Sequence, residues 1–285
     1  MICSKNDCVG CFSCYNICPQ DAIKMIEDEY GNIYPKIIDK KCIKCNMCKK
    51  VCPSINKFYG IRPKEAYAVY NKNEKIRMES TSGAAATTFY LEVLSKGGVV
   101  YGASNIFNND RFKFIRIEKQ EDLYKVKGSK YVHCYMEDNL KKIKNDLNCK
   151  KNVLFIGTPC QVAGVKFFLS KDYDNLTTID IICHGVPSQK LLFEDLKLNG
   201  IRKEDMHYIS FRDADGYSMK VYKELDKKKY EYKTILNKGF QEDNYYKNFL
   251  KGNICRPNCY KCKYAVSERI SDITIGDFWR YKKYF

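Results

Sequence analysis

The hydrophobic and polar positions after residue 64 alternate between strand-like and helix-like patterns. Short runs rich in β-branched and aromatic residues predict strands, and longer segments with apolar residues at helical spacing predict helices. The predicted strands cover 65–70, 99–103, 112–117, 152–156, 176–182, 208–211, 218–225, 230–235 and 273–275. The predicted helices cover 83–96, 121–126, 137–147, 159–170, 189–198 and 241–250. This order predicts an α/β domain with a mainly parallel or mixed sheet and an antiparallel section over 208–235.

The first 57 residues follow a different pattern, which is set by cysteine and proline. Four cysteines recur 34 residues later, and each block reads C-x2-C-x2-C-x3-C-P. A hairpin over 22–38, turning at 29–32, is expected between the two blocks. We therefore predict a small α+β ferredoxin-like domain over 1–57, a linker over 58–64 and the α/β domain over 65–285. Because the chain stops ten residues after the last predicted strand, we expect this domain to be incomplete at its C-terminus.

Composition narrows the class of protein. The chain has 285 residues, of which 45% are hydrophobic and 14% aromatic, so it can build a globular core. No apolar run approaches the roughly 20 residues of a membrane-spanning helix, and no secretory signal precedes the first cysteines, so we expect a cytoplasmic protein without a membrane span. In a reducing compartment, sixteen cysteines favour metal ligands over disulfides.

The formal net charge of +16 raises the possibility of a nucleic-acid partner. The lysines are scattered, however, and only short runs such as 227–229 occur, so we do not expect nucleic acid to be the partner. Three oxidised cubane clusters with thiolate ligands would contribute about −2 each, which would leave about +10.

The spacing of the two N-terminal blocks predicts two [4Fe-4S] clusters, because the fourth cysteine of each such run ligates the other cluster. The first cluster is then ligated by Cys8, Cys11, Cys14 and Cys52. The second is ligated by Cys42, Cys45, Cys48 and Cys18. Structural zinc is the alternative, but zinc sites rarely add a third cysteine at i+6 followed by Cys-Pro. Cys3 lies outside the pattern and is expected to be an ordinary thiol.

Further cysteines follow two strands of the α/β domain. Cys160 lies in Gly-Thr-Pro-Cys-Gln, where a helix N-terminus is expected to stabilise a thiolate, and Cys183 follows the next strand. A single cysteine in such a place is usually a small buried hydrophobe, but two in corresponding places favour a site. The loop 255–262 carries three more cysteines, giving five candidates for four positions. We predict a third cluster on Cys160, Cys183, Cys259 and Cys262, with Cys255 as the spare.

Together these residues resemble the beta subunit of coenzyme F420 hydrogenase/dehydrogenase over nearly the whole chain. The motifs that carry the resemblance are the ferredoxin-like segment 8–53, E-S-T-S-G at 79–83, G-G-V-V-Y-G at 97–102, G-S-K-Y-V at 128–132, G-T-P-C-Q at 157–161, I-C-H-G-V-P-S at 182–188, R-P-N-C-Y-K-C at 256–262 and S-D-I-T-I-G-D-F-W at 271–279. Family members commonly extend further, so this chain resembles a C-terminally shortened member. Ala84 stands where the family usually has glycine.

The resemblance implies a flavoprotein with FAD held near the third cluster. The residues expected to bind the flavin are Ser80, Ser82, Gly83, Gly128, Ser129, Lys130 and Tyr131. Hydroxyls and N–H groups before a helix suit a phosphate, and Lys130 adds a cation, although plain helix capping and a loop lysine explain the same residues. No G-x-G-x-x-G motif occurs, so nothing supports a Rossmann-type nicotinamide site.

The function implied is an iron–sulfur flavoprotein oxidoreductase that passes electrons between FAD and the clusters. Its donor or acceptor is expected to be a reduced coenzyme, a ferredoxin or a partner oxidoreductase subunit. Two alternatives stay open. One is a basic zinc-binding nucleic-acid module, and the other is a thiol enzyme with Cys160 as nucleophile and His184 as base. The sequence assigns no role to Cys134 or Cys149.

Overall fold

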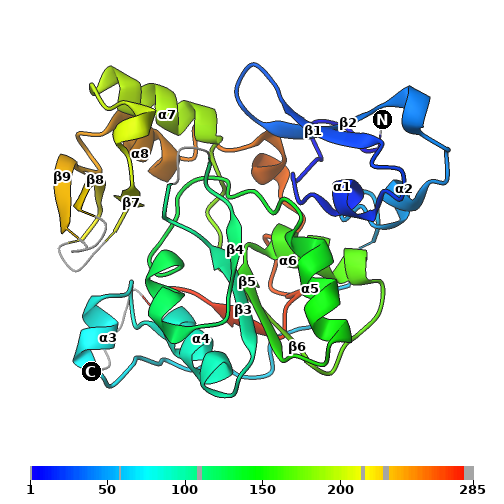
Figure 1. Ribbon diagram of the computed structural model, residues 1–285, viewed down its shortest axis with the longest axis horizontal. Coiled ribbons are helices and arrows are strands. Elements are labelled where there is room, and N and C mark those ends of the chain that lie inside the picture. The colour runs from blue at the N-terminus through cyan, green and yellow to red at the C-terminus, as the bar shows by residue number, and fades with distance from the viewer. Residues whose placement is uncertain (1, 58, 108–110, 213–215, 227–230, 279–285) are drawn as a thin grey trace.

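The computed structural model describes the chain except residues 1, 58, 108–110, 213–215, 227–230 and 279–285. Trp279 of the last motif and Tyr230 of a predicted strand therefore lie outside the described residues. Three regions are visible in Figure 1: an N-terminal unit, a central sheet with helices on both faces, and a smaller antiparallel sheet with two helices.

The central sheet has the strand order β10-β6-β5-β3-β4. Four strands run parallel to their neighbours, and β4 pairs antiparallel with β3 at one edge. The bounds are Val99–Ala103 for β3, Phe114–Ile117 for β4, Val153–Gly157 for β5, Leu176–Ile181 for β6 and Ile273–Ile275 for β10. The predicted mixed α/β sheet is thus confirmed.

Alternating side chains of the central strands point to two separate cores, as the two-residue repeat of a strand requires. Tyr101 and Phe155 belong to the core under α5 (Asn139–Asn148) and α6 (Pro159–Leu169). Val100 and Leu154 belong to the core under α4 (Ala85–Ser95). The helices therefore cover opposite faces, and the C-terminal ends of β5 and β6 are left to loops (Figure 1).

The antiparallel strands form a sheet of their own, in the order β7-β8-β9. Their bounds are Tyr208–Ser210, Ser218–Asp226 and Glu231–Gly239. Helices α7 (Gln189–Leu198) and α8 (Asn244–Leu250) contact each other beside this sheet, and their buried residues join the larger core. The predicted antiparallel pairing is confirmed.

The N-terminal unit contains the hairpin of β1 (Ile23–Glu27) and β2 (Ile33–Ile37), as predicted. Two short helices, α1 (Ser13–Ile17) and α2 (Met47–Lys50), flank it, with a 3-10 turn at Asp39–Lys41. Phe12 and Ile33 belong to the same core as the central sheet, so the unit is docked onto the rest of the chain.

The structure differs from the prediction at two predicted elements and at one that was not predicted. The strand predicted at 65–70 is wrong, because residues 61–70 are exposed and this segment has no neighbouring strand to supply ladder hydrogen bonds. The segment 121–126 forms a 3-10 helix at Gln120–Lys125 (η2) instead of an α-helix. A short helix that was not predicted, α3 (Glu74–Met78), begins after Asn73, whose side chain accepts from the N–H of Ile76.

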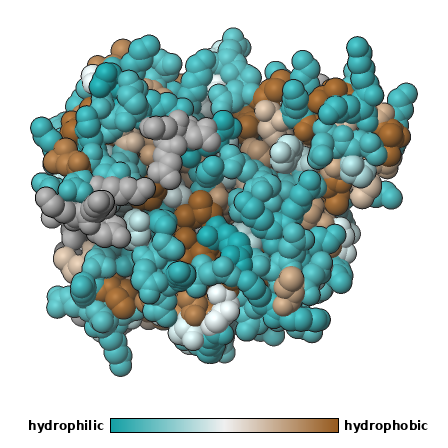
Figure 2. Space-filling view, viewed as in Figure 1, coloured by the Kyte–Doolittle hydropathy of each residue, from teal (hydrophilic) through white to brown (hydrophobic). Residues whose placement is uncertain are grey.

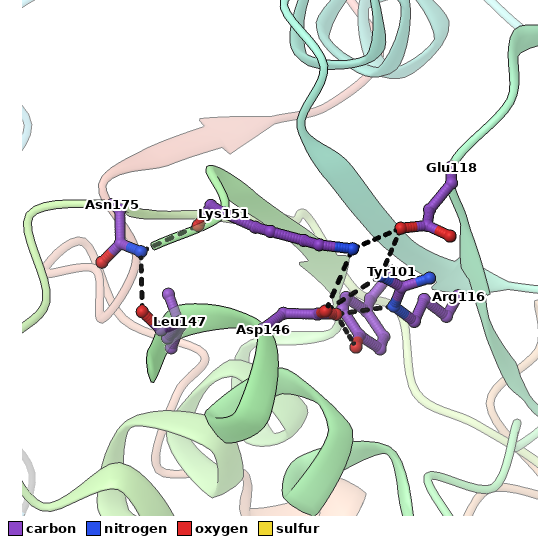
Figure 3. Close-up of polar contacts among 7 residues, drawn as sticks. All are labelled: Tyr101, Arg116, Glu118, Asp146, Leu147, Lys151 and Asn175. Carbon is purple, nitrogen blue, oxygen red and sulfur yellow. Dashed lines mark hydrogen bonds and ion pairs between the residues drawn. The ribbon is translucent and has the colours of Figure 1, made fainter. Parts of the chain in front are cut away.

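A polar network ties α5 to the edge of the central sheet (Figure 3). Asp146 accepts hydrogen bonds from the Tyr101 hydroxyl and from Arg116 Nε, both at 2.6 Å. Glu118 accepts from Arg116 and from Lys151, also at 2.6 Å. Asn175 donates to the carbonyl oxygens of Leu147 and Lys151, which closes the turn after the helix.

The surface is mainly polar. Figure 2 shows small, separate groups of apolar residues among hydrophilic ones. No helix within the described residues is long and apolar enough to cross a membrane.

Candidate iron–sulfur and flavin sites

The first cysteine group (Cys8, Cys11, Cys14 and Cys52) lines one small buried pocket. Three of these residues come from the first block, and Cys52 comes from the second. This is the exchange of the fourth ligand that the spacing predicts. Cys3, expected to be an ordinary thiol, lines the same pocket. The ligand assignment itself stays a prediction.

The thiols of this pocket differ in pKa, because hydrogen bonds and burial act on them differently. The hydrogen bond from Cys3 lowers the pKa of Cys52 to about 6 and that of Cys8 to about 7. Burial raises the pKa of Cys11 to about 12. Backbone N–H groups of Ser54 and Ile55 also point at the Cys52 sulfur. Such N–H···S contacts are the kind that tune a cluster's potential.

The second cysteine group (Cys18, Cys42, Cys45 and Cys48) repeats the backbone of the first. Gly10 and Phe12 have φ of 63° and 64°, and Lys44 and Asn46, each 34 positions on, have φ of 55° and 59°. These left-handed residues turn each loop in the same way, and the third cysteine of each loop lies in the short helix that follows. The sequence repeat is thus a repeat of conformation.

The two groups differ in exposure. The four first-group cysteines are all buried, whereas Cys45 is exposed and the other members of the second group are partly exposed. Cys48 lies close enough to Cys45 and Cys18 for their charges to raise its pKa, after burial, which has the largest effect. Here too the fourth cysteine, Cys18, comes from the other block. The second group is therefore the one nearer to solvent.

The third cysteine group (Cys160, Cys183, Cys259 and Cys262) gathers at the C-terminal edge of the central sheet. Thr158 caps α6 in a capping box with Gln161, which places Cys160 in the first turn. Cys183 follows β6, and its sulfur accepts from the N–H of Gly185 at 3.4 Å. Cys259 lies in the 3-10 turn Pro257–Lys261 (η4), and Cys262 follows it.

These four thiols lie close enough for their charges to affect one another's pKa. Burial raises the pKa of Cys160 well above its ordinary value, and the other three thiols raise it further. The expectation that the helix N-terminus stabilises a Cys160 thiolate is therefore wrong for the thiol by itself, because burial dominates. Cys255 contacts the same region, since a Cβ built at Gly185 would lie 2.6 Å from its sulfur.

The proposed catalytic pair of Cys160 and His184 has no contact that supports it. His184 Nε2 lies 3.0 Å from the carbonyl oxygen of Phe249, and its ring packs edge-on against the Phe249 ring. The sulfur of Cys160 lies 3.2 Å from the Thr158 hydroxyl instead.

The donor chemistry fits cubane clusters better than single ions. Within the described residues, no group of three or more His, Cys, Asp or Glu side chains is spaced to hold one metal ion. A tetrahedral zinc site needs all its sulfurs about 2.3 Å from one point, whereas a cubane separates its thiolates around a core of several atoms. Each group supplies four thiols and N–H donors.

The two segments predicted to bind flavin are brought together by an ion pair. Lys127 Nζ lies 2.9 Å from Glu79 Oε2, which places Ser80 and Gly128 in neighbouring loops. Ser80 is buried, and its hydroxyl bonds the Ile76 carbonyl oxygen at 2.7 Å. Ser82 and Ala84 have φ of 55° and 61°, so the turn before α4 is left-handed. That conformation explains why glycine suits position 84 in the family.

Lys130 is engaged within its own loop. Its Nζ donates to the carbonyl oxygens of Val126, Lys127 and Gly128 at 2.7, 2.8 and 3.0 Å. The Tyr131 ring stacks on Phe249 with centroids 4.9 Å apart. Both residues are partly exposed, and their roles at the flavin site stay predictions. No pattern in the sequence predicts these contacts of Lys130 and Tyr131.

Three residues that sequence reasoning missed join the first and third groups. Ser13 donates to the carbonyl oxygen of Gly164 at 2.9 Å, and a Cβ built at Gly164 would lie 2.7 Å from Cys11 Cβ. Tyr264 is buried and lies among thiols of both groups, namely Cys160, Cys11, Cys262 and Cys52. For Gly164, the only feature of the sequence that pointed to a close contact was a glycine inside a predicted helix.

Comparison with known proteins agrees with this arrangement. Residues 7–56 match the model of the 4Fe-4S dicluster domain, and residues 150–284 match the model of the C terminus of the coenzyme F420 hydrogenase/dehydrogenase beta subunit. The chain joins these two domains. Its beta-subunit domain belongs to the coenzyme F420 hydrogenase/dehydrogenase family, an oxidoreductase family, and its dicluster domain belongs to the ferredoxin-like domains that carry two 4Fe-4S clusters.

Relatives of the dicluster domain are found in Methanocaldococcus jannaschii. An uncharacterized polyferredoxin-like protein is 39% identical over 64 residues, which cover 20% of this chain and 38% of that protein. An uncharacterized ferredoxin is 32% identical over 54 residues, which cover 19% of this chain and 69% of that protein.

A solved structure is also similar. It is a chain of the F420-reducing [NiFe] hydrogenase complex from Methanosarcina barkeri, with 17% identity and a TM-score of 0.46 over 73% of this chain and 68% of that chain.

Proposed function

We propose that this protein is an iron–sulfur flavoprotein oxidoreductase that relays electrons between FAD and three [4Fe-4S] clusters. The dicluster domain supports two clusters, and the third cysteine group supplies ligands for another. Bound FAD would supply the conversion between two-electron and one-electron chemistry. The donor or acceptor at each end is a reduced coenzyme, a ferredoxin or a partner subunit.

The contact between α6 and the first group carries this proposal. Cys160 lies in the first turn of α6, and Gly164 lies one turn later with its backbone against Cys11. The third and first groups therefore lie on either side of about one helical turn, and Tyr264 lies near thiols of both. A relay from third to first to second group then stays inside protein until it reaches the exposed Cys45.

The residues proposed for the flavin are those of the turn before α4 and the loop at 128–131. Lys127 and Glu79 hold these two segments side by side. The second group is the proposed exit or entry point for a redox partner, because Cys45 is exposed and its other cysteines are partly exposed, whereas the first group of the same domain is buried.

Metal analysis of the whole chain, prepared without oxygen, tests the proposal. Three cubanes predict about twelve irons per chain with equal sulfide. Cys160→Ala should lower the count towards about eight, because the third cluster loses one of its four proposed thiolates. Cys149→Ala, at the exposed end of α5, is the matched control and should leave the iron content unchanged.

The absorbance spectrum separates the alternatives. Clusters should absorb broadly near roughly 400 nm and flavin near roughly 450 nm. Iron without flavin would contradict the flavoprotein part alone. A colourless protein with tightly bound zinc would contradict the whole proposal and favour the nucleic-acid module, whose binding should weaken steeply with salt. About eight irons in the unaltered chain would remove the third cluster.

A further inference from the structure

Among the described residues, Arg256 is the largest fully buried side chain, with 1% of its surface exposed. It precedes η4 in the loop that carries Cys259, and its head group reaches into the dicluster domain. Nη2 donates to the carbonyl oxygens of Cys8 and Ile33 at 3.0 and 3.1 Å. The guanidinium therefore lies between the loops of the first and third cysteine groups.

This buried cation has no carboxylate partner. No Asp or Glu among the described residues forms an ion pair with Arg256, and its buried Nη1 has no hydrogen-bond partner. The Tyr34 ring, 5.2 Å from Cζ, offers a cation–π contact only. A guanidinium does not deprotonate in proteins, and burying an unpaired charge is strongly unfavourable. The fold would not keep this residue here without a negative group beside it.

The groups that face the guanidinium from the other elements show where that negative charge lies. His133, packed across Gly10, is held neutral because burial and Arg256 lower its pKa well below the ordinary value. The remaining ionisable neighbours are Tyr34, Tyr135 and the thiols of Cys8 and Cys259. Each thiol belongs to a proposed cluster, and a thiolate-ligated cubane carries about −2 when oxidised.

We infer that Arg256 is a positioning residue that serves as the fixed counter-charge of the first and third clusters and raises their reduction potentials. The inference rests on the proposed function. One electron entering a cluster adds one negative charge and no proton, so a permanent cation beside it stabilises the reduced form more than the oxidised form. The unpaired Nη1 is available to donate to a sulfur of the cluster.

Redox titration of the loaded full-length protein, followed by electron paramagnetic resonance, tests the inference. In Arg256→Gln, at least one cluster should become tenfold harder to reduce at a fixed potential, which is 59 mV for a one-electron couple. Arg256→Lys keeps the charge and should stay within a factor of three of the unaltered protein. Arg202→Gln is the control, since that arginine is exposed and pairs with Asp205.

The possible failures are distinguishable. Iron in the unaltered protein tests the proposed function before any variant is made. If Arg256→Gln loads fully and its potentials do not move, the counter-charge role is overturned. If Arg256→Gln fails to load, Arg256→Lys must restore both iron and potentials. Failure of the lysine variant to restore them would show that only the hydrogen bonds to Cys8 and Ile33 matter, which also overturns the inference.

Discussion

Single residues in unusual backbone conformations define the loops of this molecule. Ala84 has φ of 61° at the residue before α4, where a side chain meets steric strain. Lys44 and Asn46 hold the same conformation in the second cysteine loop, where the first loop has Gly10 and Phe12. The chain thus accepts strain at positions where a loop must turn towards a site.

Ala84→Gly should stabilise the protein by about 1 kcal/mol, because glycine adopts this conformation without strain, even after its larger entropy in the unfolded chain is counted. Urea unfolding at fixed iron content measures this change in the free energy of unfolding. Ala86→Gly, within the same helix, should instead destabilise by about 1 kcal/mol and is the matched control. A destabilised Ala84→Gly variant would contradict the strain argument.

Lys130 shows the limit of prediction for one residue. Its place in Gly-Ser-Lys-Tyr suggested a cation for a phosphate, yet its ammonium donates to three carbonyl oxygens of its own loop. Those carbonyls end the 3-10 helix η2, and no sequence pattern marks which lysine will fold back on them. Arg256 is the opposite case, since its burial comes from docking between segments far apart in the chain.

Secondary-structure elements follow the sequence where their signals are local. The strand at 99–103 and the helix at 189–198 have the predicted bounds, because glycines precede β3 and Ser188 caps α7. The segment at 65–70 has strand-forming residues but no partner strand, and pairing is a property of the whole sheet. The first two cysteine groups were likewise predictable from spacing, and the third from cysteines that follow two neighbouring strands, whereas the contact of α6 with Cys11 was not.

The network around Asp146 joins α5 to β3 and β4, and its strength should depend on pH. Burial alone would raise the pKa of Asp146, but hydrogen bonds from Arg116 and Tyr101 bring it below its ordinary value. Hydrogen bonds from Arg116 and Lys151 lower the pKa of Glu118 to about 2. A lowered carboxylate pKa stabilises the fold above the unfolded value, near 4.5 for Glu, and the effect fades as pH falls towards 2.

Asp146→Asn should therefore lower the free energy of unfolding by about 2–3 kcal/mol at pH 7, because it leaves Arg116 without its buried partner. Glu118→Gln should cost less than about 1 kcal/mol, since this carboxylate is largely exposed and screened by solvent. Thermal unfolding between pH 7 and 3 measures both. Both variants should lose less stability on acidification than the unaltered protein, and equal slopes would contradict the assignment.

At the scale of the whole molecule, the dicluster domain is fixed to the rest by contacts from many elements. Ser188 donates to the Tyr30 carbonyl oxygen at 2.6 Å, Asn16 donates to that of Glu137 at 2.6 Å, and Arg256 bonds two carbonyls. The predicted linker at 58–64 is therefore not what sets the distance between the cysteine groups. The docking of the dicluster domain sets this distance, and we expect the distance to depend most on the contact between α6 and Cys11.

Gly164→Ala tests this docking. The new methyl would meet Cys11 Cβ at 2.7 Å, so either α6 or the first loop must move. We expect a loss of about 1–3 kcal/mol in stability and a weaker spin–spin interaction between the first and third clusters. Gly239→Ala is the control, because the nearest atom to its methyl is a Glu242 oxygen at 3.9 Å. An unchanged interaction in Gly164→Ala would show that this contact does not set the spacing.

Arg256 and Cys8 are 248 positions apart in the chain, yet they share a hydrogen bond. Ribosomes add about 5–20 residues per second, so the first thiols emerge on the order of 10 to 50 seconds before the arginine that covers them. Tyr135, whose ring packs against Phe12, is added well before Arg256. The loop with Arg256 therefore reaches the first cysteine loop late, and any cluster inserted earlier would enter a loop that this arginine does not yet cover.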